Sequence, residues 1–196
     1  MPTKSELSRE KILNAALHEF SVYGLAGARV DRIAESAGVN KAMIYYHFES
    51  KEALFNELFK AEMELLNAEI TSLFEQRDPR VEADRTLAVK GLLAYIASKK
   101  KLLSVLISET SRYGAHFPYL FQLLDVTTAF GVETAEKAGI SLKEAEEPLL
   151  HELFSGLLPL IYFVLLRDEM RDYYGWDDAT LDDRFIAYWL RHHGRY

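Results

Sequence analysis

Cysteine is absent from the sequence, and so is any long uninterrupted run of apolar residues. Without cysteine, disulfide bonds and thiolate metal sites are excluded, and the composition is compatible with a reducing cytosol. The amino-terminal ten residues lack the apolar core of a signal peptide. The longest apolar stretch, from Gly156 to Leu166, contains Pro159 and is too short to cross a bilayer. We therefore expect a soluble cytoplasmic protein with no membrane partner.

An excess of basic residues is also missing, because the net charge is −7. The charge is unevenly distributed along the chain. Residues 1–51 hold seven Lys and Arg against six Asp and Glu, so this part carries +1 and the remainder −8. A near-neutral amino-terminal part can still bind DNA through one face, and the electrostatic share of such binding should be modest.

Strand-like alternation, internal repeats and low-complexity segments are missing as well, whereas apolar residues recur at helical spacing almost throughout. Thr3 and Glu6 form a capping pattern at the start of a first helix that should end before Gly24. Its inward positions are Leu7, Ile12, Ala15, Ala16 and Phe20. Because 49% of the 196 residues are hydrophobic, the chain can bury a substantial core, and we predict an all-α fold of about nine helices.

Residues 29–48 form the most informative segment of the chain. Apolar residues recur at helical spacing up to Ala37, pause at Gly38 and then resume. Gly38 can adopt the left-handed conformation that ends a helix sharply, and Asn40 can cap the next helix. The segment predicts a helix-turn-helix, in which the second helix is free to enter a DNA major groove. A purely structural corner between two short helices is the alternative.

The second of these helices is expected to have two different faces. Ile44 and Phe48 lie four residues apart and should pack on the first helix of the motif. The opposite face and the start of the helix carry Lys41, Ala42, Met43, Tyr45 and Tyr46. Tyrosine rings can contact thymine methyl groups, phenols can donate to phosphates and lysine can reach guanine acceptors, so this face suits DNA recognition. In the alternative, one or both tyrosines pack against the chain's first helix.

A helical body follows this motif. Ser50 can cap a long helix at 51–76, and the segment 76–82 is the only clear module boundary. The inward positions of the long helix are Leu54, Leu58, Ala61, Leu65 and Ile70. Further helices are expected at 84–98, 100–112, 118–137, 144–168 and 178–193.

The ends of these body helices carry recognisable signals. They are Pro118, Gly139, a capping pair of Ser141 and Glu144, Gly175 and Gly194. Pro159 lies inside the predicted helix 144–168, where it should remove one backbone hydrogen bond and kink the helix near Gly156.

The amino-terminal third resembles the TetR family of transcriptional regulators. The resemblance rests on about 50 residues, from REKILNAALHEFSVYG to RVDRIAESAGVNKAMIYYHFESKEAL. Its specific elements are Ile33-Ala34, Ala37-Gly38-Val39, Tyr45, His47-Phe48 and Ser50-Lys51-Glu52. The resemblance implies a DNA-binding domain at 1–50 and an effector-binding and dimerisation domain at 51–196, with helix 51–76 as connector. It further implies a homodimer on a pseudo-palindromic operator in double-stranded DNA, released by a small-molecule effector, without cofactor or metal.

Carried over from the family, the base-reading positions are Lys41, Ala42 and Tyr45, and the phosphate-contacting positions are Met43, Tyr46, His47 and Lys51. His47 can instead be a structural residue that bridges helices. The chain departs from the family pattern at Met43 and at Ala28-Arg29, where a hydroxyl residue usually caps the next helix. Arg29 can supply a charged phosphate contact instead, and we expect Asp31 to interact with the free N–H groups of that helix.

Aromatic and polar residues in the body are candidates for an effector pocket. They are Tyr95, Glu109, Tyr113, His116, Phe117, Phe121, His151, Phe154 and Tyr162. Acidic groups among them would favour a cationic or amine-bearing effector. An aromatic stripe at helical spacing is, however, more often part of an ordinary core than of a pocket.

The last two predicted helices carry more apolar surface than a peripheral pair needs, and the family resemblance places a two-fold interface there. The candidate interface residues are Leu150, Phe154, Leu157, Leu158, Ile161, Leu165, Phe185 and Trp189. In the alternative, these residues only close the core of a single chain.

Two other functional classes are open to the sequence. The chain could be a helical protein-interaction module whose tyrosine face binds protein. It could also be a small helical enzyme that uses Glu109, His116, His151 and Glu152, or a metal site at His192-His193. No metal-ligand motif such as HExxH is present, and His151 and Glu152 should face different directions on a helix, so an enzyme is not expected.

Overall fold

The computed structural model describes residues 3–75, 77–113, 118–137, 139 and 146–193. Within these ranges the chain is helical and contains no strand, which confirms the all-α prediction. The helices are α1 (Lys4–Gly27), α2 (Val30–Ala37), α3 (Lys41–His47), α4 (Lys51–Phe74), α5 (Glu82–Ser98), α6 (Lys100–Tyr113), α7 (Tyr119–Lys137), α8 (Glu146–His151), the π-helix η2 (Glu152–Leu157), α9 (Leu158–Tyr174) and α10 (Asp178–His193). When the uninterrupted run from α8 to α9 is taken as one helix, the described chain has the nine helices expected. Ser141, Glu144 and Gly194 lie outside the described residues.

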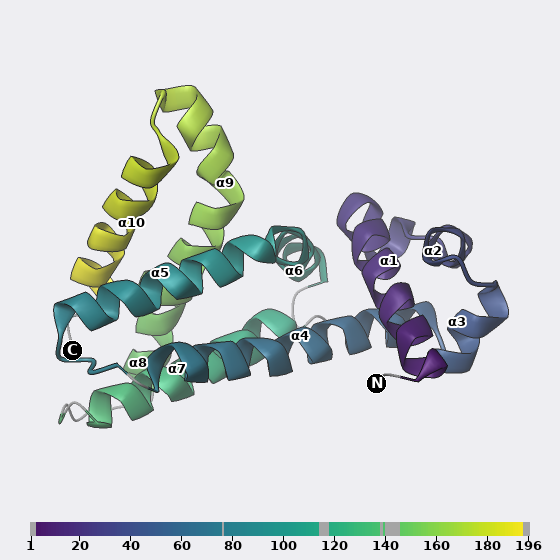
Figure 1. Cartoon of the computed structure of the whole chain (residues 1–196), viewed down its shortest axis with the longest axis horizontal. Coiled ribbons are helices and arrows are strands. Elements are labelled where there is room, and N and C mark those ends of the chain that lie inside the picture. Colours follow the sequence, from purple (N-terminus) through teal and green to yellow (C-terminus); the bar gives the residue numbers. More distant parts are fainter. Residues whose placement is uncertain (1–2, 76, 114–117, 138, 140–145, 194–196) are drawn as a thin grey trace. The chain divides into compact units, whose positions relative to one another are not determined.

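The chain divides into two compact units, whose elements are labelled in Figure 1. Unit 1 comprises Met1–Leu65 and Lys101–Tyr119, and unit 2 comprises Leu66–Lys100 and Leu120–Tyr196. Most of α6 therefore packs in the same unit as the helix-turn-helix, although it belongs to the body in sequence. The functional division at residue 50 stays a prediction, and the compact units do not follow it.

In unit 1, α1, α2 and α3 pack on one another around a small apolar core (Figure 1). The capping box predicted at Thr3 and Glu6 is present at the start of α1. Gly24, with φ 65° and ψ 176°, interrupts the regular helix at the position where the sequence predicts its end. Ile12 and Phe20 are buried as expected, whereas Leu7 is exposed because it lies in the first turn of α1, at the edge of the unit.

The beginning of α4 completes this core. Ser50 Oγ accepts a hydrogen bond from the Ala53 backbone N–H at 3.0 Å, which confirms the predicted cap. Phe55 packs edge-on against Phe20 at a ring-centroid distance of 4.8 Å. Leu54 and Leu58 are buried, but the expected inward residue Leu65 is 54% exposed. The inward pattern of α4 therefore changes where the chain passes from unit 1 to unit 2.

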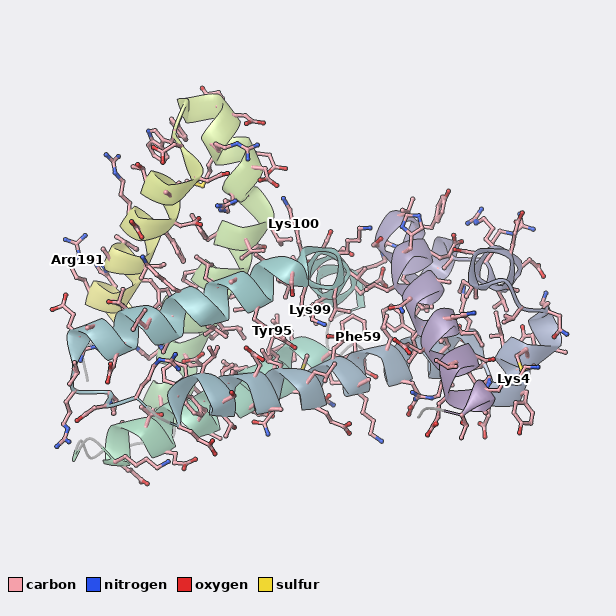
Figure 2. All side chains as sticks on the ribbon, viewed as in Figure 1. Lys4, Phe59, Tyr95, Lys99, Lys100 and Arg191 are labelled. Atoms are coloured by element: carbon pink, nitrogen blue, oxygen red, sulfur yellow. The ribbon has the colours of Figure 1, made fainter. Side chains whose placement is uncertain are left out.

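Unit 2 is built from the last part of α4, α5, α7, the α8–η2–α9 run and α10. Figure 1 shows α9 and α10 side by side, joined through the turn at Gly175, which is left-handed with φ 66°. The Phe163 and Phe185 rings stack between these helices at 3.8 Å. At the end of α5, the Nζ of the C-cap residue Lys99 lies 5.5 Å from the ring centre of Tyr95 (Figure 2).

Where the sequence predicts a kink near Gly156 caused by Pro159, the structure has a π-helical turn. Proline has no N–H to donate and clashes with the preceding turn, and the helix before it widens into η2. The helix then continues to Tyr174, six residues beyond the predicted end. The indole Nε1 of Trp189, on α10, donates to the carbonyl oxygen of Gly156 in η2 at 3.0 Å, so a neighbouring helix satisfies part of the widened turn.

The same helical run corrects one expectation from the sequence. Residues Pro148–Tyr174 form a helix whose length and mean hydropathy of 1.9 would suffice to cross a membrane, with 33% of that window buried in the chain. A core helix of a water-soluble protein passes the same test. On this run, Leu160, Ile161 and Val164 are buried within unit 2, and so is the charged residue Glu152.

Candidate nucleic-acid interface

The turn of the helix-turn-helix has the geometry that its sequence predicts. Gly38 is left-handed, with φ 65° and ψ 34°, and its N–H bonds back to the last turn of α2. Asn40 Oδ1 accepts a hydrogen bond from the Met43 backbone N–H at 2.8 Å and caps α3. Glycine is needed at residue 38 because a side chain is strained at this φ. The two residues together set the angle at which α3 leaves α2.

The two faces predicted for α3 are both present. Ile44 and Phe48 are buried, with 1% and 3% of their surface exposed, and hold the helix against the core of unit 1. Tyr45 is 47% exposed and Tyr46 is 77% exposed, so neither is packed into the core. The exposed face of α3 comprises Lys41, Ala42, Tyr45 and Tyr46, with Met43 half-buried at its edge.

The start of α2 is held by a residue that the sequence analysis missed. Glu19, which is buried on α1, accepts a hydrogen bond from the Arg29 backbone N–H at 2.9 Å and one from Arg32 Nε at 2.7 Å. The expectation that Asp31 takes this role is wrong, because its carboxylate pairs with Lys41 Nζ at 2.9 Å. This hydrogen bond raises the pKa of Lys41, which keeps the ammonium charged. A charged residue in the apolar stripe of the first helix is the signal that could have identified Glu19.

Three further predicted contact residues have neighbours within unit 1. Lys51 Nζ donates to the carbonyl oxygens of Ala26 and Ala28, at 3.5 and 3.2 Å. The ring of His47 packs edge-on against that of Tyr46, and its Nε2 is buried without a hydrogen-bond partner among the described residues. Lys51 and His47 thus have structural roles in addition to the phosphate contacts predicted for them. Arg29 is exposed.

The residues predicted to line an effector pocket do not share one environment. Phe121, Phe154 and Tyr162 have exposed side chains, and Tyr95 and His151 are half-buried. Glu109 lies in unit 1, fully buried, where its Oε1 accepts a hydrogen bond from the Leu25 backbone N–H at 3.3 Å. His116 and Phe117 lie outside the described residues, as does the side chain of Tyr113. The pocket itself stays a prediction.

Glu152, one of the residues considered for a small helical enzyme, is buried in η2 next to His193 of α10. Its Oε2 lies 3.3 Å from His193 Nε2. Burial raises the pKa of Glu152, against a smaller lowering by a hydrogen bond with Thr127. Burial also lowers the pKa of His193 to about 4, helped by the nearby His151. Burial therefore disfavours the charged form of both groups.

His151 and Glu152 were expected to face different directions, yet both reach His193. The His151 and His193 rings stack at 4.9 Å, and His151 Nε2 lies 3.1 Å from the His193 backbone oxygen. The two neighbours contact opposite parts of one histidine, which explains how both reach it. Within the described residues, no group of three or more His, Asp or Glu has a metal-binding arrangement.

The candidate dimer residues separate into core and surface. Leu157, Ile161 and Trp189 are buried in unit 2, so they do not lie on an exposed face. Leu158, Leu165 and Phe185 are half-buried. Leu150 and Phe154 are 56% and 65% exposed and therefore accessible to a partner. The interface itself stays a prediction.

Comparison with known proteins extends this description. The fold and the α2–α3 geometry define a protein of the helix-turn-helix class. Residues 12–58 match the model of the "Bacterial regulatory proteins, tetR family".

The chain is 36% identical over 115 residues to the HTH-type transcriptional repressor SCO4008 of Streptomyces coelicolor, a match that covers 58% of this chain and 56% of the relative. It is 30% identical over 120 residues to the HTH-type transcriptional repressor NicS of Pseudomonas putida, covering 58% and 53%. The chain thus spans about half the length of these curated relatives.

Solved structures show the same fold over nearly the whole chain. The fatty acid degradation regulator FadR from Bacillus halodurans matches with a TM-score of 0.71 and 21% identity, covering 93% of this chain and 94% of that one. FadR from Bacillus subtilis, solved in complex with stearoyl-CoA, matches with a TM-score of 0.66 and 20% identity, covering 95% and 99%. The resemblance to the TetR family of regulators is thereby supported at residues 12–58, and the fold is shared over nearly the whole chain.

Proposed function

We propose that this protein is a ligand-responsive transcriptional repressor that acts in the cytoplasm and binds a pseudo-palindromic operator as a homodimer. The observation that carries the proposal is the exposed face of α3, where Tyr45 and Tyr46 stand in solvent beside Lys41 while the opposite face is buried. Large aromatic side chains exposed on a short, capped helix have no partner in the core, whereas they suit the major groove. The repressor function of the relatives in S. coelicolor and P. putida supports the same role.

Binding to DNA from beside the protein's own gene tests this proposal. We expect sequence-selective complexes in a gel-shift or anisotropy titration, with an affinity that falls as salt is raised. Tyr45→Ala should reduce the affinity about tenfold or more, because a lost base contact costs about 1–3 kcal/mol. Tyr173→Ala is the matched control, because this tyrosine is 83% exposed on α9, far along the chain from the recognition helix.

Several outcomes would contradict the proposal. Absence of sequence-selective binding by the folded wild-type protein would favour a helical protein-interaction module. Equal binding by Tyr45→Ala and wild type would remove the assignment of α3 as the reading element. Equal losses in Tyr45→Ala and Tyr173→Ala would show that the effect does not depend on α3.

The homodimer is the second part of the proposal. A two-fold dimer presents two recognition helices about 34–36 Å apart, one DNA turn, and thereby predicts two half-sites in the operator. Exposed apolar residues on the α8–η2–α9 run and on α10 support an interface there. They are Leu150, Phe154, Tyr162, Leu166 and Tyr188.

Release by a small molecule is the third part. α4 begins three residues after α3 ends and contributes residues to both compact units, which supports its role as connector. We propose that an effector changes the orientation of α4 and so the distance between the recognition helices, for which a coupling free energy of about 1–3 kcal/mol suffices. Stearoyl-CoA, the ligand in the B. subtilis FadR structure, is a first probe in an operator-release assay. Release at an unchanged separation of the recognition helices would contradict this mechanism.

A further inference from the structure

The link between α1 and α2, residues 24–29, is bent and firmly held. Gly24 has φ 65° and ψ 176°, a backbone region that is essentially restricted to glycine. One further turn follows, closed by a hydrogen bond from the Ala28 N–H to the Gly24 carbonyl oxygen at 3.1 Å, and α2 begins at Val30. The conformation of this α1–α2 connector therefore decides where α2 starts, and with it the placement of α3.

Charged side chains from three different helices hold the connector. Glu19 of α1 accepts a hydrogen bond from the Arg29 N–H at its end. Lys51, at the start of α4, donates to two carbonyl oxygens in its middle. Glu109 of α6 accepts the Leu25 N–H at its beginning, which lies directly after the bend. Of these three residues, only Glu109 lies outside residues 12–58, the segment that matches the tetR family model.

Glu109 is an unusual residue for this position. Its side chain is fully buried, its nearest cation is Arg112 with Nη1 at 3.9 Å, and its Oε2 has no hydrogen-bond partner among the described residues. Burying a carboxylate with so few partners is unfavourable, and an apolar residue would pack there at lower cost. A Cβ atom at Gly24 would lie 2.8 Å from Glu109 Oε1, so a side chain at residue 24 has no room beside this carboxylate.

We infer that Glu109 is a positioning residue for DNA binding, which ties α6 to the α1–α2 connector and thereby sets the orientation of α2 and α3. The Leu25 N–H follows the bend at Gly24, and the Glu109 carboxylate supplies its acceptor from another helix. The inference rests on the proposed function, since it assigns a role in operator binding to a residue that does not itself lie on the exposed face of α3.

Substitution of Glu109 tests the inference through two readouts. In Glu109→Leu, we expect amide hydrogen exchange in residues 24–47 to accelerate at least tenfold and operator affinity to fall about tenfold, both measured well below the unfolding temperature. Glu109→Gln keeps a carbonyl acceptor for the Leu25 N–H and should restore most of both. Glu109→Asp has a shorter reach and should give an intermediate loss, which keeps the test open if the leucine variant does not fold.

Glu57→Leu is the matched control, because Glu57 also joins a later helix of unit 1 to α1, through Arg9 at 2.7 Å, without contacting the connector. It should leave exchange in residues 24–47 and operator affinity unchanged within about twofold. Folded Glu109 variants with unchanged exchange and affinity would overturn the inference, as would equal losses in Glu57→Leu. If wild type binds no operator, the proposed function fails, and the exchange readout still shows whether Glu109 holds the connector.

Discussion

At the scale of single residues, buried acids in unit 1 hold the backbone through hydrogen bonds. Glu19 accepts hydrogen bonds from a backbone N–H and from Arg32, and Arg32 also lies 4.0 Å from the centre of the Tyr23 ring. The acid thereby fixes the backbone directly before α2, whose N-cap residue Arg29 makes no side-chain capping hydrogen bond. A negative charge near a helix amino terminus is favoured by the helix dipole. Where the family pattern has a hydroxyl cap, this chain thus has a buried acid on the preceding helix near the start of α2.

His193 leads to a prediction about acid stability. Its pKa is lowered to about 4 in the folded chain, against an ordinary value of 6.5, because burial disfavours the charged ring. The unfolded chain therefore binds the proton more readily between these values, and this residue destabilises the fold as the pH falls from 6.5 towards 4. At about 1.36 kcal/mol per pKa unit, the loss can reach about 3 kcal/mol. Urea denaturation at pH 4.5, 5.5, 6.5 and 7.5 should show a stronger acid loss for wild type than for His193→Gln.

Glu152 acts in the opposite direction and must be separated from His193. Its pKa is raised by burial, so the folded chain binds this proton more readily, and the contribution of Glu152 to stability falls as the pH rises above about 4.5. The comparison of Glu152→Gln with Glu152→Gln/His193→Gln isolates the histidine, with His151 as the remaining titratable neighbour. Identical pH profiles for these two variants would show that His193 is not held in its neutral form.

At the scale of elements, the π-helical turn η2 depends on Gly156. A Cβ atom at this residue would lie 2.6 Å from His193 Cε1 and 2.8 Å from Glu152 Oε2. Alanine is favoured over glycine in a helix by about 1 kcal/mol, but such a close approach to two buried, mutually bonded side chains costs about 1–3 kcal/mol. We therefore expect Gly156→Ala to lower the free energy of unfolding by about 1 kcal/mol.

Gly131→Ala is the matched substitution for this measurement. Gly131 lies in α7, and a Cβ atom there would meet nothing within 4 Å. Its replacement should therefore raise the free energy of unfolding by about 0.5–1 kcal/mol through helix propensity alone. Opposite signs for the two glycines in denaturant titrations are the expected result. A gain at Gly156 equal to that at Gly131 would show that η2 tolerates a side chain.

The elements also show how far sequence patterns reach in this chain. The capping box at Thr3, the left-handed Gly38 and the Asn40 cap were predictable because each signal and its partner lie within a few residues. The two faces of α3 followed from helical periodicity in the same way. The role of Glu109 was not predictable, because its partner lies 84 residues away in sequence. Glu19 was marked only by its charge within the apolar stripe of α1, and its partner Arg29 lies 10 residues away.

The sequence also could not predict which apolar residues of the last helices are buried and which are exposed. Leu157, Ile161 and Trp189 have the same apolar character as Leu150 and Phe154, but only the first three are buried. Which side of the α8–η2–α9 run faces the core depends on its packing against α10 and on the widened turn. Local periodicity does not contain this information, since η2 shifts the phase of the helix.

At the scale of the whole molecule, the α8–η2–α9 run presents an exposed apolar stripe. Leu150, Phe154, Tyr162 and Leu166 are each between 46% and 65% exposed and recur at multiples of four residues. In an α-helix such a stripe drifts around the axis, because a turn has 3.6 residues. The π turn closes its hydrogen bonds five residues back, so it lengthens one turn and offsets part of that drift. The exposed residues therefore stay closer to one line along the helix, as a helix-packing interface requires.

A charge within this stripe should separate the proposed homodimer and weaken operator binding. Phe154→Glu places a carboxylate in the middle of the apolar surface, where it would be buried without a partner. We expect sedimentation to show a dimer for wild type and a monomer for the variant at about 10 µM, with operator affinity reduced more than tenfold because one half-site is lost. Leu87→Glu is the control, because Leu87 is 56% exposed on α5, outside the stripe. A wild-type monomer that associates with lipid vesicles would instead identify the stripe as a membrane-binding surface, and dimeric Phe154→Glu would place the interface elsewhere.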